Sequence, residues 1–279
     1  MGIRLTCVTA VYNAIEAGNR ERLIRCVESV SALKTAHEHL VYDGASRDGT
    51  LELLRELEKR VPRLKVVSER DTGLYNALNK GVRDAQGEWF YVLGCDDYVA
   101  RPGTFDEVMA AIPASADVVA AKVKMDRGGV LLDEWYRRRR ILIGMPYGHQ
   151  GMIARTACVR EVGGFDERYR LAADYDMVLK FHLSGRKIHF VNKTIAVFSL
   201  GGLSTGGAEA PFTEGPVTAA LLRLSGREKE MLLTHRIIPL RIAARLLFHP
   251  DPTLKVGAFY MIARKLCFLC TRILRHRGQ

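Results

Sequence analysis

With 279 residues, 48% of them hydrophobic, the chain is long enough to bury one large core and to carry an appendage. Its formal charge of +11 is unevenly distributed, because residues 217–279 hold twelve Lys and Arg against three Asp and Glu, an excess of nine. The six cysteines are scattered, and Cys267 and Cys270 have zinc-knuckle spacing without a second pair. This composition argues against a disulfide-rich or zinc-stapled fold. It predicts an anionic partner for the C-terminal part.

The first hundred residues alternate between strand-like and helix-like patterns. Residues 5–11 are rich in strand-forming residues, and residues 19–33 place apolar side chains at the three- and four-residue spacing of a helix. Strand–helix alternation with short connections is typical of an α/β fold with a mostly parallel central sheet flanked by helices. The predicted strands are residues 5–11, 39–42, 64–67 and 88–93, and the predicted helices are residues 19–33, 49–57 and 73–85.

Polar side chains stand at or just beyond the end of each of these four strands. Ligands of such sheets bind beyond the carboxyl ends of the strands, so we expect the polar side chains to meet at one edge. The fourth strand ends in two adjacent carboxylates, which repel each other unless a cation or hydrogen bonds hold them. Oxygen ligands suit Mg²⁺ or Mn²⁺, which usually partner a phosphate. In chain order the residues are Asn13, Asp43, Glu69, Asp71, Asp96 and Asp97.

The middle of the chain is less regular. Residues 116–125 are strand-like, and residues 137–140 are four consecutive arginines, which form either a solvated loop or an anion-binding loop. His149 precedes a short apolar stretch and is either a structural histidine or a ligand contact. Glycine-rich residues 201–207 are expected to form a flexible loop that orders over a ligand.

Two carboxylates mark the start of a helix that runs to residue 184. A carboxylate at this place can simply cap the helix, and Asp176 fits that role. Asp174 then needs another explanation, which makes it a candidate for chemistry.

The C-terminal sixty residues are predicted to be helical, apolar and basic. Residues 237–248 and 256–274 interleave aliphatic and aromatic side chains with Arg and Lys, and neither has the ~20 uninterrupted apolar residues of a spanning helix. Such helices lie on an anionic membrane surface, or pack on the core with a basic face exposed. No recognition motif supports nucleic-acid binding, so nucleic acid is not expected as a partner.

Five sequence blocks in order carry a resemblance to a known family. Residues 43–50 read Asp-Gly-Ala-Ser-Arg-Asp-Gly-Thr, which resembles the quite specific motif Asp-Gly-x-Ser-x-Asp-Gly-Thr. The family is the family 2 glycosyltransferases, inverting enzymes with the nucleotide-diphospho-sugar transferase A-type fold. The resemblance spans residues 3–206, and its blocks are residues 9–13, 43–50, 69–81, 94–97 and 173–176.

Two positions depart from the family pattern. Asn76 stands where the family usually has Asp, and Ala173 where it usually has Glu. The second change removes one carboxylate but leaves Asp174 in place.

The resemblance implies roles for the polar residues. Asp174 would be the general base that deprotonates an acceptor hydroxyl, and Asp97 would bind Mn²⁺ or Mg²⁺, which offsets the charge growing on the leaving diphosphate. Asp43 would accept the imide N–H of uracil or thymine, a proton that cytosine lacks. The other donor-binding candidates are Thr9, Val11, Asn13, Glu69, Asp71, Asn79 and Asp96, and the candidates for acceptor or phosphate contact are His149, Gln150, Arg138 and Asp176.

The expected reaction is inverting transfer of a sugar from a nucleotide-diphosphate donor, a UDP-sugar, to a hydroxyl of a lipid-linked glycan. Residues 149–150, 171–176 and 198–204 resemble members that build bacterial surface polysaccharides or glycolipids. The expected acceptor is therefore polyprenyl-diphosphate-linked or otherwise lipid-linked, and the four arginines and the basic tail would suit it.

The same reading predicts how the chain is organised and where it works. Residues 1–210 form the catalytic domain, with a nucleotide-sugar half at residues 1–100 and an acceptor half at residues 101–210. Residues 211–279 form a basic amphipathic helical tail. The expected location is cytoplasmic and peripheral, at the inner membrane face.

Three alternatives compete with this interpretation. A nucleotidyltransferase acting on a sugar phosphate usually has a Gly-rich, basic loop after the first strand, where residues 11–14 read Val-Tyr-Asn-Ala. A dinucleotide-dependent dehydrogenase needs Gly-x-Gly-x-x-Gly there, and that motif is absent. A catalytically degenerate membrane scaffold does not need the carboxylates of Asp43, Asp96, Asp97 and Asp174.

Overall fold

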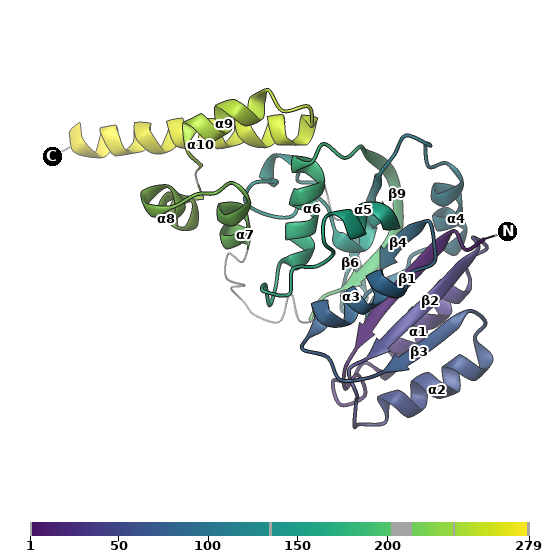
Figure 1. Ribbon diagram of the computed structural model, residues 1–279. Coiled ribbons are helices and arrows are strands. Elements are labelled where there is room, and N and C mark those ends of the chain that lie inside the picture. The colour runs from purple at the N-terminus through teal and green to yellow at the C-terminus, as the bar shows by residue number, and fades with distance from the viewer. Residues whose placement is uncertain (1, 134–135, 202–213, 237, 278–279) are drawn as a thin grey trace.

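In the computed structural model, which describes residues 2–133, 136–201, 214–236 and 238–277, nine strands form one mixed sheet at the centre of the fold (Figure 1). The strand order is β3-β2-β1-β4-β8-β6-β9-β5, and β7 pairs with β6. The strands are β1 (Leu5–Val11), β2 (His37–Asp43), β3 (Leu64–Ser68), β4 (Trp89–Val92), β5 (Tyr98–Val99), β6 (Val118–Arg127), β7 (Val130–Asp133), β8 (Met152–Arg155) and β9 (Ile188–Ser199).

The first four strands are parallel neighbours, as the alternating pattern predicts. β1 pairs with β2 and β4, and β2 pairs with β3, all in parallel. Their register places Val11 beside Asp43 and Asp43 beside Ser68, so the polar residues of β1, β2 and β3 reach one edge together. β8 runs antiparallel to β4 and β6, whereas β6 and β9 are parallel. The predicted α/β fold with a largely parallel sheet is confirmed.

Helices cover both faces of the sheet (Figure 1). Because side chains alternate along a strand, Cys7 packs in the core beneath α1 and α4, while Val8 packs in the core beneath α3, α5 and α6. These helices are α1 (Arg20–Ser31), α2 (Thr50–Arg60), α3 (Leu74–Asp84), α4 (Pro102–Ala110), α5 (Thr156–Glu161) and α6 (Ala173–Leu183), and two short 3₁₀ turns are η1 (Arg138–Arg140) and η2 (His149–Gly151).

The C-terminal helices share a core with α6 and with the segment that follows η1. In this core Ile141 and Tyr175 pack with Leu232, Ile242 and other buried residues of the tail. A Cβ at Gly257 would lie 2.5 Å from Ile141 Cγ2, so glycine is needed for this close approach. The predicted helices at residues 237–248 and 256–274 are confirmed. The four helices are α7 (Glu214–Leu221), α8 (Gly226–His235), α9 (Leu240–Leu247) and α10 (Pro252–Arg277).

The structure does not test three predictions: the glycine-rich loop, the absence of a metal site at Cys267 and Cys270, and the domain boundary at residue 210. Most of the glycine-rich loop at residues 201–207, and the side chains of Cys267 and Cys270, lie outside the described part of the chain. The division at residue 210 stays a prediction. Within the described residues, no helix combines the length and the apolar character that crossing a membrane requires.

Candidate active site

Asp43 ends β2 as a buried carboxylate that is only 1% exposed. Its Oδ2 accepts hydrogen bonds from Ser68 Oγ at 2.7 Å and from the Ser46 backbone N–H at 3.2 Å. A buried carboxylate needs such donors, because an unpaired charge in the interior is very costly. The two serines therefore fix Asp43 at the sheet edge.

Asn13 and Asp71 join Asp43 around the loop that follows β2. The backbone of Asn13 is left-handed, with φ 45°, and its N–H donates to Ser46 Oγ at 2.8 Å. Asp71 Oδ2 lies 2.8 Å from the place that a Cβ would take at Gly44, so a glycine there lets Asp71 approach. Non-glycine residues in left-handed conformations concentrate at functional sites. The predicted convergence of these three residues is confirmed.

Thr9 and Val11 lie beneath the group formed by Asn13, Asp43 and Asp71, which we call the donor corner, rather than in it. The hydroxyl of Thr9 is fully buried and donates to the Leu93 carbonyl oxygen at 2.9 Å. Val11 packs in the core under α1 and α2. Strand alternation turns both side chains toward the interior, so the predicted contact of Thr9 and Val11 with a donor could be made only by their backbone. The side chains support the strand ends instead.

Glu69 remains half-exposed at the rim of the donor corner. Its Oε1 lies 3.0 Å from Lys80 Nζ, which also donates to the Arg70 carbonyl oxygen at 2.9 Å. The lysine is therefore held at the rim by both contacts.

Asn79 is occupied by contacts within the protein. Its Nδ2 donates to the Phe165 carbonyl oxygen and to Glu167 Oε1, both at 2.8 Å, and its Oδ1 accepts the Phe165 N–H at 2.9 Å. These bonds tie α3 to the turn before α6. The structure therefore corrects the donor-binding prediction for Asn79 and assigns its side chain to positioning.

Asn79→Ala is expected to lower the free energy of unfolding by about 2 kcal/mol, because it leaves the Phe165 backbone groups without partners. Affinity for UDP should stay unchanged. Urea unfolding and calorimetric titration of UDP measure the two quantities. A variant of normal stability with weakened UDP binding would contradict the positioning role.

Asp96 and Asp97 follow β4 and are the next polar group along the sheet edge. Asp97 is 1% exposed, and its two oxygens accept the Ser199 backbone N–H at 2.8 Å and Gln150 Nε2 at 3.1 Å. Burial, with Asp96 as the second cause, raises the pKa of Asp97 to about 7. Burial also raises the pKa of Asp96, and the positive charge of Arg22 partly opposes this. Gln150 thus supports Asp97.

This carboxylate pair fits a divalent cation. Each group has a raised pKa, which a bound cation would reverse. No cluster of three or more His, Cys, Asp or Glu suited to a metal occurs in the described part of the chain. Mg²⁺ and Mn²⁺ sites often use one or two carboxylates and take further oxygens from substrate phosphates. The residues present therefore suit a cation that arrives with a diphosphate.

The raised pKa of Asp97 predicts how the metal-free protein responds to pH. The folded carboxyl group keeps its proton up to about pH 7, whereas the ordinary value is 3.8, so the folded state binds more protons between these values. Stability is then fully present below the lower value and is lost as pH rises through the higher one. We expect the thermal midpoint in chelator to fall over this window, and to fall less in Asp97→Asn. Equal slopes in scanning calorimetry would contradict the assignment.

Asp174 lies in the first turn of α6, after Ala172, whose φ of 73° is left-handed. Its Oδ1 accepts the Tyr175 N–H at 2.9 Å and the Tyr75 hydroxyl at 3.3 Å. Its Oδ2 accepts no hydrogen bond from any residue that the structure describes. One oxygen is therefore held in place, and the other is available to a ligand.

His149 lies close to Asp174, in the core beside Phe165. Its ring meets the Phe165 ring edge to face at 5.9 Å, and its buried Nε2 has no hydrogen-bond partner among the described residues. Burial lowers the pKa of His149, and the negative charge of Asp174 partly opposes this. A structural histidine would have its ring nitrogens satisfied, so this orphaned nitrogen favours the ligand-contact alternative.

Asp176 does not cap α6 and does not face a ligand. Helix α6 begins at Ala173, and Asp176 is 1% exposed, with Oδ2 2.6 Å from Lys180 Nζ. The predictions of a capping role and of acceptor or phosphate contact are therefore wrong for Asp176. The helix starts four residues earlier than a cap at Asp176 would require, which turns this side chain inward.

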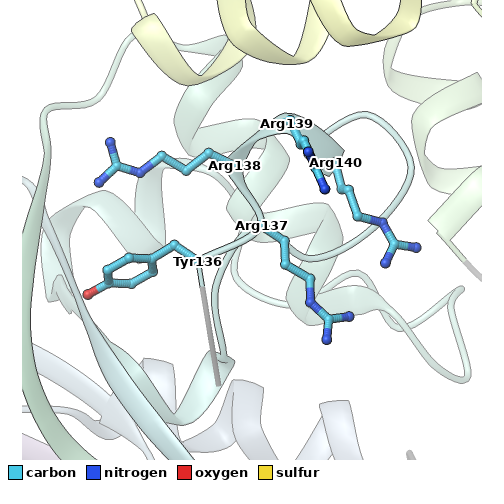
Figure 2. A pocket seen from close by; sticks show the side chains of 5 residues that line it. All are labelled: Tyr136, Arg137, Arg138, Arg139 and Arg140. Atoms are coloured by element: carbon cyan, nitrogen blue, oxygen red, sulfur yellow. The ribbon is translucent and has the colours of Figure 1, made fainter. Parts of the chain in front are cut away.

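The four arginines line a cavity of about 650 Å³ together with Tyr136. Arg138 lies over the Phe190 ring, with Cζ 3.5 Å from the ring centroid. Figure 2 shows Arg138 extending on the side of Tyr136, while Arg137 and Arg140 point the other way. Arg137, Arg138 and Arg139 are exposed, so the cavity can receive an anion.

A hydrogen bond links this arginine segment to the helix of Asp174. The hydroxyl of Tyr175 donates to the carbonyl oxygen of Ile141, directly after Arg140, at 2.6 Å. Both residues are fully buried. The segment that follows the four arginines thus contacts the helix that carries Asp174.

Comparison with known proteins agrees with this arrangement. Residues 6–167, more than half of the chain, match glycosyl transferase family 2. A PGL/p-HBAD biosynthesis glycosyltransferase from Mycobacterium tuberculosis is 29% identical over 191 residues, which cover 64% of this chain and 72% of the relative.

Two solved structures share the fold. TarS 1-349 from S. aureus, in complex with UDP-GlcNAc, matches with a TM-score of 0.66 and 17% identity, over 95% of this chain and 92% of that one. The mannosyltransferase PcManGT from Pyrobaculum calidifontis, in complex with GDP-Man and Mn²⁺, matches with a TM-score of 0.56 and 17% identity, over 94% and 86%. The chain belongs to glycosyl transferase family 2 and is a nucleotide-sugar-dependent glycosyltransferase.

Proposed function

We propose that the enzyme transfers a sugar from a UDP-sugar to a hydroxyl of a lipid-linked acceptor, with inversion at the anomeric carbon. The observation that carries this proposal is Asp174, whose Oδ1 is anchored and whose Oδ2 accepts no hydrogen bond from a described residue, because such a carboxylate suits a general base. The donor carboxylates Asp43 and Asp97 lie at the ends of other elements, so base and donor groups are separate.

The donor side is built to accept a uridine diphosphate. Among the described residues Asp43 Oδ1 has one distant donor, the Ser46 N–H at 3.4 Å, which leaves acceptor capacity for the imide N–H of uracil. Asn13, Glu69 and Asp71 would line the nucleoside pocket. TarS binds UDP-GlcNAc and PcManGT binds GDP-Man in this fold, so the choice of uracil rests on Asp43.

Asp97 and Asp96 would hold the divalent cation. When bound, Mn²⁺ or Mg²⁺ supplies positive charge to the diphosphate as it leaves. Gln150 and the Ser199 N–H orient Asp97 for this task. The complex of PcManGT with Mn²⁺ supports a metal in this fold.

The acceptor side is arranged around Asp174. Its Oδ2 would take the proton of the acceptor hydroxyl, while the oxygen attacks the anomeric carbon from the face opposite the diphosphate. One displacement without a covalent intermediate inverts that carbon. Tyr75 holds the carboxylate in orientation, and the orphaned Nε2 of His149 would bind the acceptor or the transferred sugar.

Two observations favour a lipid-linked acceptor in surface glycan or glycolipid synthesis. The arginine cavity offers guanidinium groups that suit a phosphate, and Tyr175 links it to the base-bearing helix. Arg138 would contact that phosphate. The name of the mycobacterial relative, which places it in PGL/p-HBAD biosynthesis, also favours a lipid product.

Calorimetric titration tests the donor assignment. UDP, dTDP, GDP and CMP are titrated into the protein with Mn²⁺ and, separately, with chelator. We expect metal-dependent binding of UDP and no binding of CMP, because cytosine has no imide proton for Asp43. Binding of none of the four would overturn the proposal and favour a scaffold.

A further inference from the structure

The outer faces of α9 and α10 concentrate exposed apolar side chains. Phe248 is 88% exposed and Phe259 is 68% exposed, which is unusual for residues of this size. The exposed positions recur at three- and four-residue intervals, so each helix presents one continuous stripe. The exposed large apolar residues of this region are Leu240, Phe248, Val256, Phe259 and Leu266.

The two stripes form one surface. The opposite sides of the helices are buried in a shared core, through Ile242 and Leu246 of α9 and through Leu254 and Met261 of α10. Figure 1 shows α9 beside α10 at the end of the molecule, away from α2 and β3. Because α9 lies beside α10 and both bury one side in the same core, their exposed sides both lie on the outside of this helix pair. We call this surface the α9–α10 face.

The α9–α10 face is also basic. Arg245 and Lys255 are exposed beside its apolar residues, and no acidic residue occurs in α9 or α10. The surrounding residues 217–279 carry the excess of nine positive charges. Apolar side chains rimmed by Lys and Arg are the pattern of helices that lie in the interface of an anionic bilayer.

We propose that the α9–α10 face binds the surface of an anionic lipid bilayer, with both helices lying in its plane. A second copy of the chain is a poorer occupant, because a symmetric contact would place each basic face against an identical basic face. The inference rests on the proposed function only for the lipid-linked acceptor. The face itself stands on its exposed side chains and charge.

The arginine segment contacts the inner side of α10, away from the α9–α10 face. Arg139 Cζ lies 5.7 Å from the ring centroid of Tyr260 on α10, and Gly257 of α10 packs on Ile141. With the α9–α10 face on a bilayer, the arginines would therefore lie about one helix diameter, ~10 Å, from its surface.

Point variants test the proposal, since truncation of the tail would remove Leu232, Ile242 and Met261 from the core. Flotation is measured with vesicles of phosphatidylcholine plus phosphatidylglycerol and with vesicles of phosphatidylcholine alone. We expect the double variant Phe248→Ser, Phe259→Ser to lose more than about tenfold in affinity for the mixed vesicles. The double variant Arg245→Glu, Lys255→Glu should bind them as weakly as wild type binds phosphatidylcholine alone.

Leu131→Ser on β7 is the matched control, because Leu131 is 46% exposed on another element, and it should bind like wild type. Circular dichroism confirms that each variant is folded. Wild-type binding by both double variants would overturn the proposal, as would a change in oligomeric state without a change in vesicle binding. The flotation assay contains no nucleotide and no acceptor. A negative result in it therefore says nothing about the proposed donor, and a negative nucleotide titration says nothing about membrane binding.

Discussion

Asp174→Asn is expected to reduce sugar transfer by more than about 100-fold, because an amide cannot take the proton of the acceptor hydroxyl. The variant should keep its fold, since the Asn oxygen can still accept the Tyr175 N–H and the Tyr75 hydroxyl, as Asp174 does. Affinity for UDP should be unchanged, because the groups that would hold UDP lie on other elements. Transfer of labelled sugar and calorimetric titration of UDP measure the two quantities.

Asp166→Asn serves as the control for loss of one nearby negative charge. Asp166 pairs with the exposed Arg168 near the start of α6 and has no proposed part in the reaction. It should retain most of its transfer activity. Loss of UDP binding in Asp174→Asn, or activity equal to the control, would remove Asp174 from the role of base.

Asp97→Ala is expected to remove both transfer activity and the effect of Mn²⁺ on UDP binding. The change deletes one of two adjacent carboxylates and also leaves Gln150 Nε2 and the Ser199 N–H without their acceptor. UDP affinity in Mn²⁺ should then fall to the value that the wild type shows in chelator. Titration of UDP in both conditions measures this directly.

Asp97→Asn separates charge from packing. The amide has nearly the same volume and can keep the Ser199 bond through its oxygen, while Gln150 can turn its amide oxygen toward the new N–H₂ group. It should be folded and equally inactive. A fully active Asp97→Ala, or a Mn²⁺ effect on UDP binding in either variant, would refute the metal assignment.

The sequence pattern was sufficient for the architecture because local periodicity and chain order constrain a parallel sheet strongly. Residues 5–11 and 39–42 alternate with helices, and short connections leave little choice but parallel pairing. What the pattern does not encode is the second half of the sheet. The antiparallel insertion of β8 between β4 and β6 depends on long-range packing, which periodicity does not report.

The sequence predicted the site residues that follow the ends of strands. It predicted less well the residues that hold those side chains in place by hydrogen bonds. Asp43, Asp97 and Asn13 lie at the predicted edge of the sheet. Thr9 and Asn79 instead form hydrogen bonds inside the protein, with residues that are distant in sequence. The residues that hold the carboxylates were missed. Ser46, Tyr75 and Ser199 lie in residues 43–50, 69–81 and 198–204, which resemble the family, so a signal was present for each. Ser68 lies in none of these blocks and gains its role from a contact with Asp43 that is distant in sequence.

The Tyr175–Ile141 hydrogen bond has a consequence for acceptor choice. It joins the segment whose arginines would bind a phosphate to the helix that carries the proposed base, and both partners, the Tyr175 hydroxyl and the Ile141 carbonyl group, belong to buried residues. The enzyme would then select acceptors by the distance between these two groups. A lipid-linked acceptor that binds at both places would need a spacing between its phosphate and its reactive hydroxyl that matches the spacing of the arginines and Asp174.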